Sequence, residues 1–260
     1  MRTKERNKLA LTASLLSVVS ILAFPVKASP SAERTTPSRG VGRIVGRVLV
    51  EGHFEKPRPL KVYKNRDFCG PQVPNESLLV GSRGGVQNVV VTIPKARGEI
   101  MASPAKSLVL DNRNCAFVPH VQIAPAGNEI LLLNSDPILH DVHTRIGSET
   151  LFNVGLPTWR QVKKRLRREG IVKVECDVLH TWQSAYIVVT SSPYFAVTDE
   201  KEEFVIEGVP PGTYQMDVWH EQLGGLLKRV VVTGGGASQI DLVFASYPKG
   251  FAPGREDGRL

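Results

Sequence analysis

Residues 117–140 read FVPHVQIAPAGNEILLLNSDPILH, and residues 176–183 read CDVLHTWQ. The first stretch holds two short apolar runs, 121–123 and 129–133, which are separated by the turn signal Pro125-Ala-Gly127. Short apolar runs bounded by proline, glycine and asparagine predict β-strands. The second stretch sets a cysteine four residues before a histidine, and both side chains bind soft or borderline metal ions. Together the two stretches predict a β-protein with a metal-binding loop.

The same alternation of short strands and turns continues on both sides of these stretches. Pro210-Pro-Gly212 and Gly234-Gly-Gly236 are strong turn signals, and we expect short helical pieces only near residues 158–168. Many short strands with regular turns predict an all-β sandwich or barrel. Further candidate strands lie at residues 43–50, 86–93, 108–110, 171–174, 185–190, 203–206, 214–219, 229–233 and 239–244.

The order of these features resembles the cupredoxin, or type 1 copper, family. Phe117 and Pro119 precede a strand, a glycine turn follows, and Asn134-Ser-Asp136 leads to His140. The resemblance covers roughly residues 107–190. It implies a Greek-key β-sandwich that holds one copper ion in a mononuclear site, with His140, Cys176 and His180 as the equatorial ligands.

The residue types suit a copper ion that changes oxidation state. Copper(I) prefers thiolate and copper(II) accepts imidazole, so two histidines and one cysteine serve both states. The resemblance places Gln183 where most cupredoxins have an axial methionine. An amide oxygen is an accepted axial ligand, and as a harder donor it should lower the reduction potential. The loop also resembles half of the binuclear copper loop of cytochrome oxidase subunit II, but Val172 stands where that site needs a second cysteine.

Three residues near this pattern each have two interpretations. His143 is either an alternative ligand or a non-ligating neighbour of His140. Trp182 either covers the site and excludes water or packs in an ordinary core. His220, in the string Trp219-His-Glu221, either contacts a metal or faces the site, or it belongs to a turn at the end of a strand.

The chain has three cysteines, Cys69, Cys115 and Cys176. An oxidising compartment favours disulfides, and an odd count leaves one thiol unpaired. We expect a structural disulfide between Cys69 and Cys115, worth roughly 2–4 kcal/mol, which leaves Cys176 for the metal. Two alternatives stay open: Cys176 pairs with one of the others, or Cys69 and Cys115 are buried free thiols.

Residues 195–244 resemble a carboxypeptidase-regulatory-like, or transthyretin-like, β-sandwich module. The matching string is FVIEGVPPGTY at 204–214, although the turn before it lacks the usual glycine. The early strands of such a module match residues 42–50 and 88–93. We therefore expect the cupredoxin-like unit to be inserted between the early and late strands of this second sandwich. The alternative is a larger cupredoxin unit that includes the early strands itself.

The amino terminus has the pattern of an export signal. Arg2, Lys4, Arg6 and Lys8 precede an apolar run from Leu9 to Phe24, and small residues flank Lys27. The run is short for a membrane span, which needs about 20 residues, so we expect a cleaved signal and a periplasmic or secreted protein with no membrane span. An uncleaved anchor is the alternative. The expected organisation is a signal peptide (1–28), a linker (29–41), N-terminal strands (42–106), a cupredoxin-like copper domain (107–190), the regulatory-like module (191–246) and a tail (247–260).

The charge of the chain is unevenly spread. Residues 1–28 carry five basic residues and one acidic residue, so the mature chain keeps +4 of the total net charge of +8. That excess is too small to indicate nucleic acid binding. A basic run is either a solvated face or a docking surface for an acidic redox protein such as a c-type cytochrome or a dehydrogenase, because clustered charge speeds encounter. Its members are Arg160, Lys163, Lys164, Arg165, Arg167 and Arg168.

These features predict an exported copper protein that carries single electrons. The combination of modules resembles methylamine-utilisation-type secreted cupredoxin-domain proteins. The chain lacks a GxSxG elbow, an HExxH zinc helix and a GxGxxG fingerprint, so we do not expect an independent enzyme. Two rivals remain: a copper carrier or envelope interaction module without electron transfer, and a cupredoxin fold that binds no metal.

Overall fold

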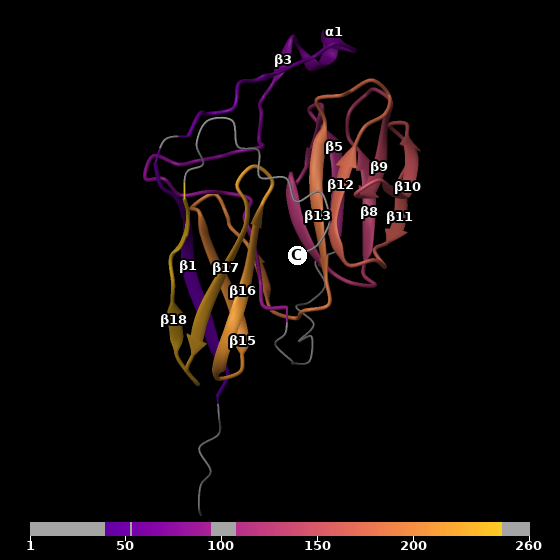
Figure 1. The fold of residues 1–260 in the computed structure, drawn as a ribbon. Helices are drawn as coiled ribbons and strands as arrows, with labels where there is room; N and C mark the ends of the chain where they lie inside the picture. Colours follow the sequence, from indigo (N-terminus) through magenta and orange to yellow (C-terminus); the bar gives the residue numbers. More distant parts are fainter. Residues whose placement is uncertain (1–39, 53, 95–107, 246–260) are drawn as a thin grey trace, which may run out of the picture. The chain divides into compact units, whose positions relative to one another are not determined.

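Side chains that alternate between the core and solvent place about half of the described residues in β-strands, and the fold of these residues is all-β as expected. The computed structural model describes residues 40–52, 54–94 and 108–245, drawn in colour in Figure 1. The expected signal peptide, all but the end of the linker, and the tail (247–260) lie outside the described residues. The described residues belong to one unit, Arg39–Leu260. In the described ranges no helix has the length and apolar character to cross a membrane.

The central sandwich contains the strands of residues 108–190. They are β5 (Leu108–Arg113), β6 (Ala116–Val118), β7 (Val121–Pro125), β8 (Glu129–Asn134), β9 (His140–Ile146), β10 (Glu149–Leu156), β11 (Val162–Arg165), β12 (Gly170–Glu175) and β13 (Ser184–Thr190). One sheet has the order β10-β9-β12-β13-β7 and the other β11-β8-β5-β6. β13 runs parallel to β7 and β5 runs parallel to β8, while the other neighbours are antiparallel.

The flanking sandwich combines strands from both ends of the described chain. They are β1 (Gly42–Val50), β4 (Val90–Thr92), β14 (Phe195–Val197), β15 (Glu203–Val209), β16 (Gly212–His220), β17 (Gly224–Val232), β18 (Ala237–Gln239) and β19 (Leu242–Phe244). One sheet has the order β15-β1-β18, with β19 also on β1, and the other has the order β14-β4-β16-β17. The central sandwich therefore lies, in sequence, between the neighbouring strands β4 and β14 of one flanking sheet.

Between β1 and β4 the chain makes a short excursion that we call the covering segment, residues 60–73. It consists of β2 (Leu60–Lys61), the four-residue helix α1 (Arg66–Cys69) and β3 (Gln72–Val73), with β2 and β3 paired antiparallel. Val62 and Val73 of this segment pack with Cys115 and Trp182 in a small apolar cluster. The segment is thereby attached to the central sandwich.

Each sandwich has its own apolar core. Ile130 and Leu132 of β8 are fully buried in the central core, together with Ile187 of β13. Met216 and Ile44 hold the corresponding positions in the flanking core. Burying one such side chain stabilises the fold by about 1.5–3 kcal/mol, so each sandwich is held together by a core of its own.

Two sequence expectations are wrong in detail. The 158–168 stretch contains a strand, β11, where we expected short helical pieces, because Val162 and Leu166 turn inward while Lys163 and Arg165 face solvent. We expected one strand over residues 86–93, but the strand there, β4, contains only residues 90–92. Asn88 interrupts the extended backbone there, since its φ of 61° is left-handed.

Candidate metal centre

Two loops at one end of the same sheet bring the predicted ligands together. His140 is the first residue of β9, Cys176 directly follows β12, and His180 lies in the loop before β13. β9 pairs antiparallel with β12, and Glu175 lies opposite His143. The start of β9 therefore meets the end of β12, and side chains 36 to 40 residues apart converge.

The three donor atoms fit a single metal ion. Sγ of Cys176 lies 4.0 Å from Nδ1 of His140 and 3.6 Å from Nδ1 of His180, and the two Nδ1 atoms are 3.0 Å apart. A circle through the three atoms has a radius of about 2.1 Å, within the roughly 2.0–2.3 Å of metal–nitrogen and metal–sulfur bonds. Both histidines are 0% exposed and Cys176 is 4% exposed. Two imidazoles and one thiolate form a donor set that copper accepts in both oxidation states.

The outer nitrogens of both imidazoles have oxygen partners, which turns the inner nitrogens toward the cluster. Nε2 of His140 donates to Oδ2 of Asp136 at 3.0 Å. Nε2 of His180 donates to Oδ1 of Asn65 at 2.8 Å. With the protons on Nε2, both Nδ1 atoms present lone pairs to the cluster. The two Nδ1 lone pairs then face each other at 3.0 Å with no proton between them. A cation bound between the two nitrogens would accept both lone pairs.

Gln183 lies against the same point. Its Oε1 is 2.9 Å from Nδ1 of His140, and its side chain is buried. Its Nε2 is buried with no hydrogen-bond partner among the described residues. The carbonyl end, which is the end that binds metal, therefore faces the histidines. The structure brings Gln183 to the cluster in a position where it could serve as a fourth donor.

Burial governs the protonation of the ligand set. Burial raises the pKa of the Cys176 thiol to about 12. Burial, followed by the charges of His140 and Lys64, lowers the pKa of His180 to about 4. Burial also lowers the pKa of His140, against the opposing charge of Asp136. At neutral pH both imidazoles are therefore ready to bind metal, whereas the thiol must first release a proton.

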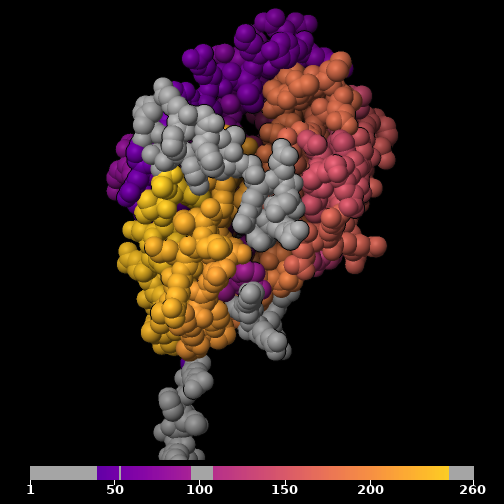
Figure 2. All heavy atoms as spheres, viewed as in Figure 1, coloured from indigo at the N-terminus to yellow at the C-terminus, as the bar shows by residue number. Residues whose placement is uncertain are grey.

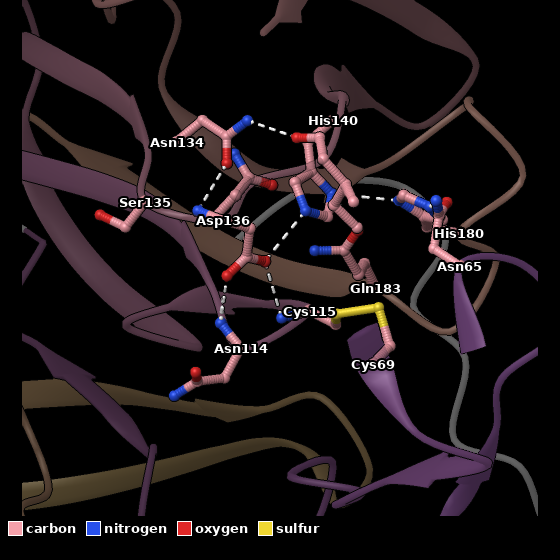
Figure 3. Close-up of polar contacts among 12 residues, drawn as sticks. Asn65, Cys69, Asn114, Cys115, Asn134, Ser135, Asp136, His140, His180 and Gln183 are labelled. Atoms are coloured by element: carbon pink, nitrogen blue, oxygen red, sulfur yellow. Dashed lines mark hydrogen bonds and ion pairs between the residues drawn. A yellow bond between two sulfur atoms is a disulfide. The ribbon is translucent and has the colours of Figure 1, made fainter. Parts of the chain in front are cut away.

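Asp136 is held by backbone groups as well as by the histidine (Figure 3). The amide of Asn114 donates to Oδ1 at 2.7 Å, and the amide of Cys115 donates to Oδ2 at 2.8 Å. Asn134 fixes the loop from the other side, because its Nδ2 donates to the carbonyl oxygens of Ile138 and Leu156. The Asn-x-Asp part of the motif thus supports His140 and stays outside the donor cluster.

The cysteine sulfur has a polar contact of its own. The backbone N–H of Asp141 points at Sγ of Cys176 at 3.5 Å. The carboxylate of Asp141 in turn accepts from the amide of Asp177. An amide donor at the sulfur favours the thiolate over the thiol, so this contact opposes part of the effect of burial.

The cysteine pairing is settled in the structure. Cys69 and Cys115 form a disulfide, and Cys176 is a buried free thiol. The alternative in which Cys176 joins a disulfide is therefore wrong, as is the alternative of two unpaired cysteines.

The three neighbouring candidates lie in different places. His143 points away from the cluster, with Nδ1 2.9 Å from Asp177 and Nε2 2.8 Å from Thr150. The ring of Trp182 lies 5.0 Å from the ring of His180, so it does pack beside the site. His220 is buried in the flanking sandwich, where its Nδ1 accepts from two backbone amides, and it is not part of the His140–Cys176–His180 group.

The basic run begins at Arg160, before β11, and continues along β11 and into the turn after it. Arg165 pairs with Glu129 at 3.1 Å, Arg168 pairs with Glu149, and Lys164 lies 5.5 Å above the ring of Phe152. Arg160 donates to a backbone carbonyl. Lys163 and Arg167 are exposed. The run is largely exposed, and neighbouring acids balance part of its charge.

Two polar contacts were not predicted from the sequence. Asn65 bonds a residue 115 positions away, and no local motif marks it. His120 bonds Glu221 of the flanking sandwich and lies 3.9 Å from Glu76. Burial lowers the pKa of His120, but the bond and charge of Glu221 outweigh it and the pKa is raised. The sequence shows His120 and Glu221 as separate residues, and only the folded chain brings them into contact.

Comparisons with known proteins give partial matches. The family model for polysaccharide lyase family 4, domain II, matches residues 168–240, which includes strands of both sandwiches. The carboxypeptidase-regulatory-like resemblance stays a prediction. No curated protein matches the chain.

The solved structures that resemble the chain include copper proteins. A purple cupredoxin from Nitrosopumilus maritimus has 21% identity, covers 38% of this chain and 97% of its own, and has a TM-score of 0.26. A reduced amicyanin variant has 16% identity, with coverages of 38% and 97% and a TM-score of 0.30. A copper-containing nitrite reductase from Thermus scotoductus SA-01 has 18% identity, with coverages of 32% and 22% and a TM-score of 0.29. TM-scores this low carry no argument about the function of this chain. The case for a metal centre therefore depends on the arrangement of the chain's own donor atoms.

Proposed function

We propose that this chain is an exported mononuclear type 1 copper protein that carries single electrons between redox partners. One observation carries the proposal. Sγ of Cys176 and Nδ1 of both His140 and His180 face one point inside a buried end of the central sandwich. One thiolate with two imidazoles suits copper in both oxidation states, whereas zinc, which also accepts these donors, has no redox chemistry.

Copper bound there would supply a reversible one-electron couple between copper(I) and copper(II). The residues of the chain supply the frame for it. Asp136 and Asn65 hold the imidazoles in orientation, and the amide of Asp141 contacts the sulfur. A frame held by hydrogen bonds and packed strands changes little when the metal changes state, and small rearrangement favours fast electron transfer. We propose that Gln183 completes the site as an axial donor.

The partner we propose is an acidic redox protein, such as a c-type cytochrome or a dehydrogenase, in the periplasm or outside the cell. The basic run at residues 160–168 would attract it; its members are Arg160, Lys163, Lys164, Arg165, Arg167 and Arg168. Charge of this kind raises the encounter rate more than the affinity. The proposal is a carrier, and it assigns no independent enzymatic reaction to the chain.

A second candidate function is a copper carrier or a structural copper site. The observation in its favour is that both imidazoles are fully buried, and Asn65 covers the outer edge of His180. A donor or acceptor therefore has no direct contact with a ligand ring. Reversible reduction at a defined potential would favour the electron carrier, whereas bound copper that cannot be cycled would favour this second function.

The test is a copper(II) titration of the exported chain, followed by visible absorption. We expect an intense thiolate-to-copper band that saturates at one equivalent. Cys176→Ser should lose the band, while His143→Gln, which changes a histidine outside the cluster, should keep it. Protein that stays colourless and binds no copper would overturn the proposal.

A further inference from the structure

Asn65 makes an unusual use of its side chain. It precedes α1 in the N-cap position, where an asparagine side chain normally accepts a hydrogen bond from its own helix. Here it makes no such cap bond. Its Oδ1 instead accepts from Nε2 of His180 at 2.8 Å (Figure 3). The backbone of Asn65 is left-handed, with φ 55° and ψ 37°, a conformation that asparagine tolerates better than most residues.

The covering segment that carries Asn65 is anchored next to the ligand loop. Lys64 donates to the carbonyl oxygen of Val178 at 3.1 Å, and Val62 packs with Trp182. The outer side of the segment is at the surface, with Tyr63 and Phe68 exposed; it is drawn in indigo at the top of Figure 2. The segment thus lies between solvent and the edge of His180, which is 0% exposed.

The disulfide joins the supports of both imidazoles. The carbonyl oxygen of Asn65 accepts from the amide of Cys69 at 2.9 Å. Cys69 is bonded to Cys115. The amide of Cys115 donates to Asp136, which accepts from Nε2 of His140. A continuous path of hydrogen bonds and one covalent link therefore connects the outer nitrogens of the two histidines. Figure 3 shows the disulfide and the contacts of Asp136 in this path.

We propose that Asn65 is a positioning residue for the metal centre: it fixes the ring of His180 with Nδ1 inward, and the Cys69–Cys115 disulfide keeps it in place. This inference rests on the proposed copper site. An outer partner of a ligating histidine fixes its tautomer and ring orientation, and losing such a partner costs metal affinity about 10–100-fold. Loss of Asn65 would also open the edge of His180 to water.

Asn65→Gly tests the proposal, because glycine keeps the left-handed backbone and removes the acceptor. Asn65→Asp keeps an oxygen at the same reach and should restore the contact. Asn88→Gly is the matched control: Asn88 also has a positive φ, of 61°, and lies outside the metal centre. All three variants are made in the exported chain with the Cys69–Cys115 disulfide intact.

The first measurement needs no metal. Nitrogen-15 NMR follows exchange of the His180 Nε2–H with water, with the signal assigned by its loss in His180→Gln. We expect exchange to be roughly 2–12-fold faster in Asn65→Gly, which corresponds to the loss of a hydrogen bond worth about 0.5–1.5 kcal/mol. Wild-type exchange is expected in Asn65→Asp and in Asn88→Gly. If Asn65→Gly acted only by loosening the fold, there would be no reason for Asn65→Asp to show the wild-type exchange rate.

The second measurement is copper affinity by chelator competition, in which Asn65→Gly should bind about 10–100-fold more weakly. Unchanged NMR exchange in Asn65→Gly would overturn the inference, whatever the affinity. If the wild-type chain binds no copper, the proposed function fails, while the NMR measurement still decides whether Asn65 positions His180.

A double variant, Cys69→Ser with Cys115→Ser, tests the second half of the proposal and replaces Asn65→Gly if that variant does not fold. It retains Asn65 and removes only the covalent link. Faster exchange of the His180 Nε2–H, compared with wild type, is expected. Wild-type exchange in this variant would show that the disulfide does not hold Asn65.

Discussion

Trp182 donates its indole N–H to the carbonyl oxygen of Cys115 at 3.0 Å, which ties the ligand loop to the disulfide. Both groups are buried. Trp182→Phe would keep most of the ring but leave that carbonyl without its donor, and an unpaired buried polar group costs about 1–3 kcal/mol. We expect the free energy of unfolding in urea to fall by that amount.

Trp159→Phe provides the matched control for this change. Trp159 is 82% exposed, so the same substitution there should leave the urea midpoint unchanged. Equal effects at the two tryptophans would contradict the role assigned to the Trp182 hydrogen bond.

Replacing Gln183 with methionine should raise the reduction potential of the bound copper. An amide oxygen is a harder donor than a thioether and stabilises copper(II) more. Potentiometry of the wild type and of Gln183→Met gives the comparison, with Gln183→Leu as a variant that removes the donor altogether. If all three proteins share one potential, Gln183 is not an axial ligand.

Copper uptake should release a proton from Cys176. Burial raises the pKa of this thiol to about 12, so the metal-free protein carries the thiol at neutral pH, and apparent affinity should fall about tenfold per unit of decreasing pH. Near pH 4 the decline should steepen, because the pKa of His180 is lowered to about 4. Calorimetry in two buffers with different ionisation heats counts the protons. Uptake without proton release would mean that Cys176 does not bind as thiolate or is already ionised.

The His120–Glu221 pair should stabilise the fold most at low pH. The bond and charge of Glu221 outweigh burial and raise the pKa of His120. A raised histidine pKa gives stability that is fully present below the ordinary value of about 6.5 and is lost as pH rises through the folded value. The stability difference between wild type and His120→Gln should therefore shrink from pH 6 to pH 9.

The effect of His120 must be measured as a difference between variants, because the titration of His220 changes the stability of the fold with pH in the opposite direction. Burial, with the charge of His120, lowers the pKa of His220 to about 4, so this residue costs stability as pH falls from about 6.5 toward 4. Glu221→Gln should remove the same pH-dependent difference as His120→Gln, and the double variant should add little. A difference that does not change with pH would show that the pair is not ionised.

The grouping of His140, Cys176 and His180 could be predicted because its sequence signals are local. Cys176 and His180 lie in one short loop, and His140 follows a recognisable Asn-Ser-Asp stretch, so sequence spacing was enough to group them. Their supports behave differently. Asn65 reaches His180 across 115 positions and His120 reaches Glu221 across 101, and no spacing rule covers contacts that only the folded chain creates.

The strand β11 shows why secondary structure is hard to predict from a highly charged stretch. Six basic residues in nine obscure the alternation of Val162, Lys164 and Leu166 toward the interior. Lys164 fits this inward row because its chain lies over the ring of Phe152, as long basic side chains do when they cover apolar surface.

The interruption of the flanking sandwich has a consequence for the order of folding. β1 pairs with β15, β18 and β19, so its ladders close loops as long as the 194 positions between Val48 and Leu242. The strands of residues 108–190 find all their sheet partners within that stretch. Closing short loops costs less chain entropy and proceeds faster. We expect the central sandwich to form before β1 has paired with its last partner strands, so the proposed copper site could assemble while the flanking sandwich is still incomplete.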